Sequence, residues 1–167
     1  MALDVLILMG SDSDAPVMQA AGDVLTEFGV TWEMTVASAH RSPARVTSLV
    51  DGAPGRGVKV FIVGAGAAAH LAGVVAAHST LPVIGVPIDS SALKGMDALL
   101  STVQMPPGVP VATVSIGKPG ATNAAVLAAQ ILAVGDAAMS KKIQDYKKKL
   151  ADKVEAAAER LNAPAHT

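Results

Sequence analysis

A histidine and an arginine stand side by side in the segment 38–43, which follows a run of β-branched and apolar residues. Histidine is a residue type that can act as a general acid or base near neutral pH, which makes His40 a candidate for that role. Arg41 carries a permanent charge and can bind a phosphate or carboxylate through two parallel hydrogen bonds. A lone loop histidine is usually a surface residue, but this pair at a strand end also fits a catalytic site. We interpret Pro43 as the start of the next helix and Ser42 as its cap.

A turn rich in serine and aspartate, residues 10–14, follows the first apolar run of the chain. The pattern predicts a change from strand to helix, where free backbone N–H groups and the Ser11 hydroxyl can bind an anion. Asp14 can cap that helix or accept hydrogen bonds from ribose hydroxyls. Both interpretations stay open, because Ser and Asp are also favoured helix caps. The turn lacks the lysine of a P-loop, which argues against nucleoside triphosphate hydrolysis.

A glycine-rich segment, residues 64–71, reads GAGAAAHL. It fits the dinucleotide fingerprint G-x-G-x-x-G/A, and Asp89 follows after the next predicted strand. That fingerprint normally opens a domain, whereas two strand–helix units precede it here. A glycine-rich turn can instead bring backbone N–H groups close to the phosphate or carboxylate of a smaller ligand. We expect His70 one turn into the following helix, where it either points at the site or packs against the protein.

Short β-branched runs alternate with longer segments of helical spacing along most of the chain. Strands are predicted at 3–9, 30–37, 58–63, 82–86 and 109–115, and helices at 15–28, 43–50, 67–78, 96–103 and 121–134. Five apolar strands joined by helices predict a parallel sheet with both faces covered. We therefore expect a three-layer, doubly wound α/β fold, with the flavodoxin-like strand order as a hypothesis. The three segments described above then lie at the carboxyl ends of strands, where sites form in such folds.

The C-terminal part of the chain has a different surface from the rest. Residues 140–161 predict one further helix, and residues 141–167 carry more basic than acidic side chains. A narrow apolar stripe runs along this helix through Ile143, Tyr146, Leu150, Val154 and Leu161. The helix either lies on its own subunit or forms an arm that contacts a neighbouring subunit. We divide the chain into an α/β domain of residues 1–139, this helix, and a frayed tail of residues 162–167.

Composition excludes several classes of protein. Hydrophobic residues make up 51% of the 167 residues and charged residues 16%, which is typical of a folded chain and not of a disordered one. Cysteine is absent, so disulfides, thiolate metal sites and cysteine nucleophiles are excluded. A net charge of −1 and 2% aromatic residues disfavour nucleic-acid binding. We find no metal-ligand cluster, no G-x-S-x-G turn and no membrane or export segment, and we expect a cytoplasmic protein.

Seven separated blocks of the sequence, read in order, resemble the N5-carboxyaminoimidazole ribonucleotide mutase family of purine biosynthesis. The blocks are MGSDSD, SAHRSP, GAGAAAHL, LPVIGVPI, SSALKGMDALLS, VQMPPGVPV and IGKPGATNAAVLAAQIL. The resemblance implies a flavodoxin-like fold, a homo-octamer with active sites between subunits, and no metal or organic cofactor. It also implies a functional link to the ATP-dependent synthase that makes the substrate.

The resemblance carries specific roles onto this chain. It makes His40 the catalytic residue, and it places the other site residues around a small ribonucleotide substrate. These substrate-binding residues are Gly10, Ser11, Asp12, Asp14, Ser38, Ala39, Arg41, Ala65, Gly66, Ala67, His70 and Leu71.

The implied reaction moves a carboxylate from the exocyclic nitrogen of the aminoimidazole to ring carbon 4. Loss of CO2 gives the free amine, carbon 4 attacks the trapped CO2, and His40 first donates a proton and then removes the one on carbon 4. Two alternatives stay open. One is direct carboxylation by CO2, as in the animal sister group, and the other is a nicotinamide dinucleotide site at residues 64–69.

Overall fold

The computed structural model describes residues 3–162 and contains one five-stranded sheet. All neighbouring strands are parallel, and their order is β2-β1-β3-β4-β5. The strands are β1 (Val5–Met9), β2 (Trp32–Val36), β3 (Val60–Gly66), β4 (Val83–Ile88) and β5 (Ala112–Thr113). This arrangement confirms the doubly wound α/β fold and the flavodoxin-like strand order.

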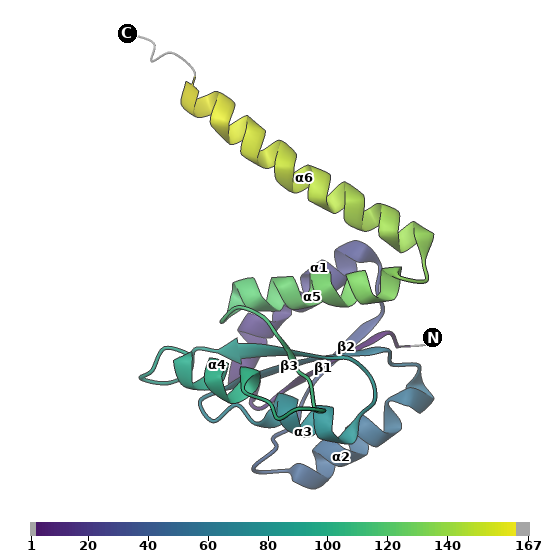
Figure 1. The fold of residues 1–167 in the computed structure, drawn as a ribbon, viewed down its shortest axis with the longest axis vertical. Helices are drawn as coiled ribbons and strands as arrows, with labels where there is room; N and C mark the ends of the chain where they lie inside the picture. Colours follow the sequence, from purple (N-terminus) through teal and green to yellow (C-terminus); the bar gives the residue numbers. More distant parts are fainter. Residues whose placement is uncertain (1–2, 163–167) are drawn as a thin grey trace.

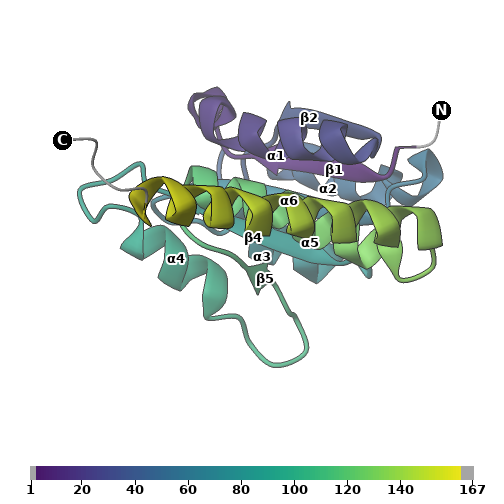
Figure 2. The same ribbon diagram turned by 90° about the horizontal axis from the view of Figure 1, so that it is seen from above.

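Helices cover both faces of the sheet (Figures 1 and 2). One face carries α1 (Ala15–Phe28) and α5 (Lys118–Ala133), and the other carries α2 (Pro43–Gly52), α3 (Leu71–His78) and α4 (Met96–Val103). Two 3₁₀ turns, η1 (Asp12–Asp14) and η2 (Pro54–Arg56), precede α1 and follow α2.

The interior strand β1 explains why both faces must be covered. Its five residues are all buried, and they alternate between the two cores. Ile7 packs in the core beneath α1 and α5, whereas Leu6 and Leu8 pack in the core beneath α2 and α3. A parallel strand buried on both faces reads as one continuous apolar run, which is the pattern that predicted it.

Three element bounds differ from the sequence prediction in ways that affect the site. Strand β3 continues to Gly66, beyond the predicted end at residue 63, because Gly64 and Gly66 stay paired with β4. Helix α3 begins at Leu71 and not at residue 67, since Ala67 adopts a left-handed conformation (φ 51°). Strand β5 has only two residues, because the prolines of residues 106–110 cannot donate to the ladder.

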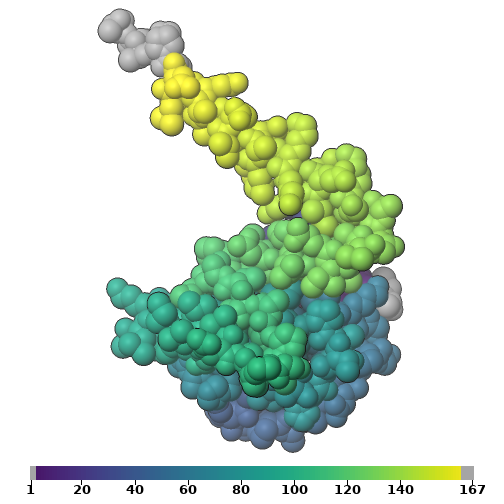
Figure 3. All heavy atoms as spheres, in the orientation of Figure 1, coloured from purple at the N-terminus to yellow at the C-terminus, as the bar shows by residue number. Residues whose placement is uncertain are grey.

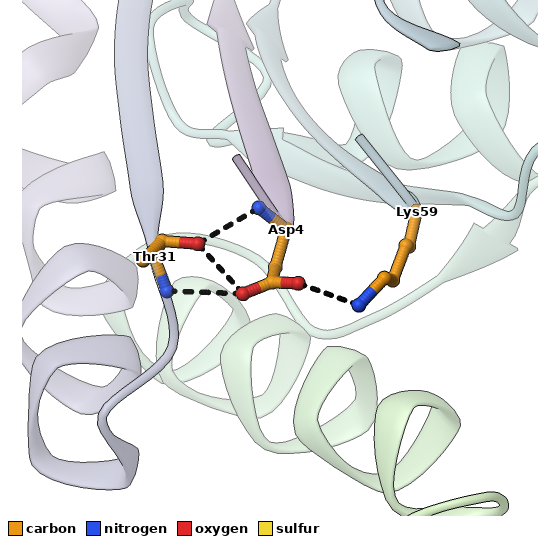
Figure 4. A network of polar contacts seen from close by, with 3 residues as sticks. All are labelled: Asp4, Thr31 and Lys59. Carbon is orange, nitrogen blue, oxygen red and sulfur yellow. Dashed lines mark hydrogen bonds and ion pairs between the residues drawn. The ribbon is translucent and has the colours of Figure 1, made fainter. Parts of the chain in front are cut away.

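The amino-terminal edge of the sheet is tied together by Asp4, which directly precedes β1 (Figure 4). Its carboxylate accepts hydrogen bonds from the Thr31 hydroxyl at 2.6 Å and from Lys59 Nζ at 2.8 Å. Thr31 precedes β2 and Lys59 precedes β3, so the three strand starts are held side by side. Burial acts to raise the pKa of the Asp4 carboxyl, but the hydrogen bonds from Lys59 and Thr31 outweigh it, and the pKa is lowered.

The last helix, α6 (Ala137–Asn162), starts on the body and then leaves it (Figures 1 and 3). Met139 and Ile143 are buried against α5, and the Tyr146 ring lies 5.2 Å from that of Phe28. Further along, Val154 is 67% exposed and Leu161 is 86% exposed. The helix begins three residues before its predicted start at residue 140. Of the predicted tail, Asn162 is still helical, and residues 163–167 lie outside the described part of the chain.

Candidate active site

The carboxyl ends of the strands supply the walls of one cleft. It lies beside β1 and β3, where the strand order reverses direction, which is the usual ligand position in doubly wound folds. The turn after β1, the loop after β2 and the segments after β3 and β4 all contribute. The lining residues are Gly10, Ser11, Ser13, Asp14, Ser38, Ala39, His40, Arg41, Ala65, Gly66, Ala68, His70, Leu71 and Ser90.

The turn after β1 is stabilised by its own side chains. The Ser11 hydroxyl accepts a hydrogen bond from the Ser13 amide at 3.3 Å, and Asp14 Oδ2 accepts one from the Ser11 amide at 3.2 Å. This capping box occupies two of the backbone N–H groups that we expected to bind an anion. The hydroxyls and the nearby guanidinium are therefore the main donors left for a ligand here.

Asp14 is the one buried acidic side chain of the cleft, with 5% of its surface exposed. Burial raises the pKa of its carboxyl, although the hydrogen bond from the Ser11 amide and the charge of Arg41 act in the opposite direction. Both sequence interpretations of Asp14 can hold at once. Oδ2 caps the turn, while Oδ1 makes no hydrogen bond to any residue that the structure describes.

The Arg41 guanidinium joins the two loops that precede α1 and α2. Its Nη2 donates to the Gly10 carbonyl at 2.7 Å, and its Nε donates to the Ser38 hydroxyl at 3.3 Å. A guanidinium has five N–H donors, so several remain for an anionic ligand. Ser42 stands at the N-cap position of α2 as predicted, but its side chain makes no capping hydrogen bond, because its hydroxyl donates to the Ser38 carbonyl at 3.3 Å and thereby folds the loop back on itself.

The two histidines of the cleft contact each other directly. His40 Nε2 and His70 Nδ1 lie 2.8 Å apart, and the rings meet edge to face with centroids 4.9 Å apart. The prediction that His70 lies one turn inside the helix is wrong. It occupies the position just before the first residue of α3, because the turn at Ala67 delays the start of that helix.

The glycine-rich segment does not form the turn of a dinucleotide fingerprint. Gly64 and Gly66 lie within β3, so the turn consists of residues 67–70. Gly66 is required for packing, because a Cβ at this position would come within 1.8 Å of the Ser90 hydroxyl. The segment supplies the wall of the cleft that faces the loop after β2.

Most of the predicted site residues meet in this cleft. Asp12 and Ala67 do not line it; Asp12 instead borders a neighbouring groove that shares Ser11 and Arg41 with the cleft. The prediction missed Ser13, Ala68 and Ser90. Ser13 and Ala68 lie inside segments that the sequence had singled out, and Ser90 follows β4 at the same edge of the sheet. Within residues 3–162, no group of three or more acidic or histidine side chains is placed to hold a metal ion.

The segments that line the cleft lie within a stretch of the sequence that matches a known protein family. A family model described as AIR carboxylase matches residues 4–153. This chain belongs to the AIR carboxylase family. The match extends from the start of β1 into α6 and therefore includes every lining residue of the cleft.

Individual members of the AIR carboxylase family are similar over most of the chain. An N5-carboxyaminoimidazole ribonucleotide mutase from Bacillus subtilis is 56% identical over 139 residues, which cover 83% of this chain and 86% of that protein. A phosphoribosylaminoimidazole carboxylase from Saccharomyces cerevisiae is 51% identical over 155 residues, 93% of this chain but only 27% of that protein. A crystal structure of a PurE2 variant from Treponema denticola aligns with a TM-score of 0.88 at 28% identity, covering 97% and 99% of the two chains.

No helix in the described part of the chain is long and apolar enough to cross a membrane.

Proposed function

We propose that this chain interconverts N5-carboxyaminoimidazole ribonucleotide and 4-carboxy-5-aminoimidazole ribonucleotide in de novo purine biosynthesis. It is thus an isomerase, as the names of its relatives at about 50% identity indicate. One geometric observation carries the assignment of roles. His40 and the turn at residues 10–14 line the same cleft, so one ligand can contact both.

The sugar phosphate is bound at the end of the cleft near β1. Because the capping box occupies the amides of Ser11 and Ser13, the phosphate is bound by hydroxyls of this turn and by the free N–H groups of Arg41. Arg41 is already held against the Gly10 carbonyl, so its charge stays in place before the ligand arrives. Asp14 Oδ1 accepts hydrogen bonds from the ribose hydroxyls. This arrangement puts the base of the nucleotide toward His40.

His40 moves the protons of the reaction. Its imidazolium donates a proton to the exocyclic nitrogen as the bond from nitrogen to the carboxyl carbon breaks and CO2 leaves. Carbon 4 of the aminoimidazole then attacks the CO2, and the neutral imidazole removes the proton from carbon 4. The enzyme returns to its starting state with no net proton gained or lost. A positioned acid–base group of this kind supplies roughly 100- to 10,000-fold in rate.

Small and apolar groups form part of the wall that faces the loop after β2. Gly66, Ala68 and Leu71 line the cleft on the side of β3 and α3. These small and apolar groups, which alternate with the polar side chains of His70 and Ser90, suit an uncharged CO2 molecule and limit its contact with water, so that recapture by carbon 4 competes with its escape. Gly66 also shapes this wall, because the absence of a side chain at residue 66 leaves room for the Ser90 side chain beside β3.

Direct carboxylation is the second candidate, since the Saccharomyces cerevisiae relative carries a carboxylase name at 51% identity. One assay separates the two activities. The purified protein is given the N-carboxylated ribonucleotide without ATP, and in parallel the parent aminoimidazole ribonucleotide with bicarbonate. We expect rapid conversion of the first at substrate concentrations where the second gives little product. Faster use of the parent compound with CO2 would instead assign the carboxylase activity.

Self-association is a further part of the proposal. Exposed apolar side chains follow one side of α4 and the loop before it, where Leu93 is 64% exposed and Met96 is 52% exposed. The outer half of α6 exposes Leu150, Val154 and Leu161. Such surfaces are costly in water, which supports contacts between subunits. We propose a homo-octamer in the cytoplasm, with α6 as a contact arm and a functional link to the ATP-dependent synthase that supplies the substrate.

A further inference from the structure

The pair formed by His40 and His70 has a property that neither ring has alone. A hydrogen bond between two ring nitrogens needs one donor and one acceptor, so only one proton lies between His40 Nε2 and His70 Nδ1. The 2.8 Å separation and the nearly perpendicular rings (80°) suit such a bond. The identity of the donor therefore fixes the tautomer of both histidines.

Hydrogen bonding to the ring of His40 involves one other side chain in the described part of the chain. Within residues 3–162, the bond to His70 is the one hydrogen bond that either ring makes. The two charged side chains of the cleft are engaged elsewhere, Arg41 with the Gly10 carbonyl and Asp14 with the Ser11 amide. In a Ser-His-Asp triad a carboxylate selects the tautomer of the histidine. In this cleft the group within hydrogen-bond distance of the His40 ring is a second imidazole.

We propose that His70 is a positioning residue whose Nδ1 accepts the Nε2 proton of His40. This inference rests on the proposed function, in which His40 alternately donates and accepts a proton. In this tautomer the Nδ1 lone pair of neutral His40 is free to take the proton from carbon 4. The resulting imidazolium keeps its Nε2–H bond to His70, and that bond becomes stronger because its donor is now charged.

The opposite arrangement blocks the same chemistry. If His70 Nδ1 donated its proton to His40 Nε2, the lone pair of His40 would already be used in that bond. Its Nδ1 would carry a proton, so His40 could act as a base only after the two rings had separated. The position of His70 directly before α3 holds its ring at this distance, because the left-handed turn at Ala67 ends β3 and sets the start of the helix.

Substitutions at His70 test the proposal by separating kcat from KM. His70→Ala removes the acceptor, whereas His70→Asn retains a polar atom close to the place of Nδ1. We expect kcat of His70→Ala to fall by about tenfold or more, a part of the 100- to 10,000-fold that a positioned acid–base group supplies, with KM within about threefold. His70→Asn should recover much of the lost rate. The control is His78→Ala, since His78 is exposed at the end of α3 and outside the cleft.

Nitrogen-15 NMR of histidine-labelled protein reads the tautomer directly, with the four histidines assigned from single variants. We expect neutral His40 to be protonated at Nε2 in the wild type and to become a tautomer mixture in His70→Ala. The proposed pairing would be overturned if His70→Ala kept its kcat or changed only in KM, or if the Ala and Asn variants lost the same amount of kcat. It would also be overturned if neutral His40 in the wild type were protonated at Nδ1. Failure of the wild type and of His78→Ala to convert the N-carboxylated ribonucleotide would instead overturn the proposed function.

Discussion

At the scale of single residues, Asp14 and Arg41 each stabilise a loop of the cleft and also keep polar atoms available for a ligand. Asp14 closes the turn after β1 with one carboxylate oxygen and leaves the other for a ligand. Arg41 holds two loops together and still has N–H groups to offer. The site is therefore arranged before the substrate binds, which lowers the entropic cost of binding and of aligning the reacting atoms.

Asp14→Asn tests the binding role at this scale. The asparagine carbonyl can still accept the hydrogen bond from the Ser11 amide, so we expect the turn to stay folded. Loss of the charged acceptor for the ribose should raise KM by about tenfold, with a smaller effect on kcat, because a hydrogen bond to a charged group is worth about 1.5–3 kcal/mol.

The pH dependence of KM provides the matching control for this variant. Burial raises the pKa of Asp14 above its ordinary value of 3.8, so its protonation begins at a higher pH than for a solvated aspartate. Wild-type KM should therefore rise as the pH falls toward that pKa, and the rise should be absent in Asp14→Asn. If the KM of the wild type changed as little with pH as the KM of Asp14→Asn, this would argue against ribose binding by the Asp14 carboxylate.

At the scale of elements, the two ends of the sheet have different roles: the amino-terminal ends of the strands hold the strands in alignment, and the carboxyl ends form the cleft. The Asp4 network aligns the starts of β1, β2 and β3 at the end opposite the cleft. The carboxyl ends of the same strands then place the Ser11 turn, His40 and the segment that carries His70 side by side. Register set at one edge thus fixes distances at the other, because strands are stiff and closely paired.

Asp4→Asn is expected to destabilise the fold without a direct effect on the site. We expect a loss of about 1 kcal/mol in the free energy of unfolding at pH 7, from weakened bonds to Lys59 and Thr31. The folded pKa of Asp4 is lowered from 3.8, so this contribution is present above pH 3.8 and is lost as the pH falls through the folded pKa.

Thermal unfolding of the wild type and of Asp4→Asn, measured from pH 7 into the acidic range, tests whether the contribution of Asp4 to stability decreases as the pH falls. The Tm difference between wild type and Asp4→Asn should stay constant from pH 7 to about pH 5 and shrink in more acidic solution. Asp51→Asn is the control, because Asp51 is exposed and its side chain makes no hydrogen bond or ion pair within residues 3–162. A difference that grows on acidification would contradict the assignment.

Strands and helices were predicted well from the sequence where their positions depend only on the pattern of neighbouring residues. The buried strands and α4 follow from apolar runs and helical spacing, and the strand ends correctly placed His40 and the Ser11 turn in one cleft. The bonds of Asp4 were missed, since its partners lie 27 and 55 residues away and meet it only through the strand order. The position of His70 was missed because a left-handed alanine leaves no signal in composition.

At the scale of the whole molecule, the chain has a packed body and a helix that leaves it. The first part of α6 is anchored by Ile143 and Tyr146, and the apolar side chains beyond them are exposed. Figure 3 shows the outer part of the helix standing away from the body. Most helical stability in proteins comes from packing of an apolar face, and the outer half of α6 exposes its apolar residues Leu150, Val154 and Leu161. The stripe predicted from the sequence is therefore anchored to its own subunit at one end and available for a second subunit at the other.

Val154→Glu tests this contact. A charge in the stripe should weaken self-association, so the variant should sediment as smaller species than the wild type at the same concentration in analytical ultracentrifugation. Ala156→Glu introduces the same charge on the other side of the helix and should sediment like the wild type. The contact role of α6 would be refuted by identical sedimentation of wild type and Val154→Glu.

The central claim is that His40 performs the proton transfers above a nucleotide bound at the turn of residues 10–14. The most direct measurement compares turnover of the N-carboxylated ribonucleotide with its dissociation constant, in the wild type and in His40→Asn. We predict that turnover falls by at least about 100-fold while the dissociation constant changes by less than about threefold. Turnover of His40→Asn within tenfold of the wild type would contradict the account.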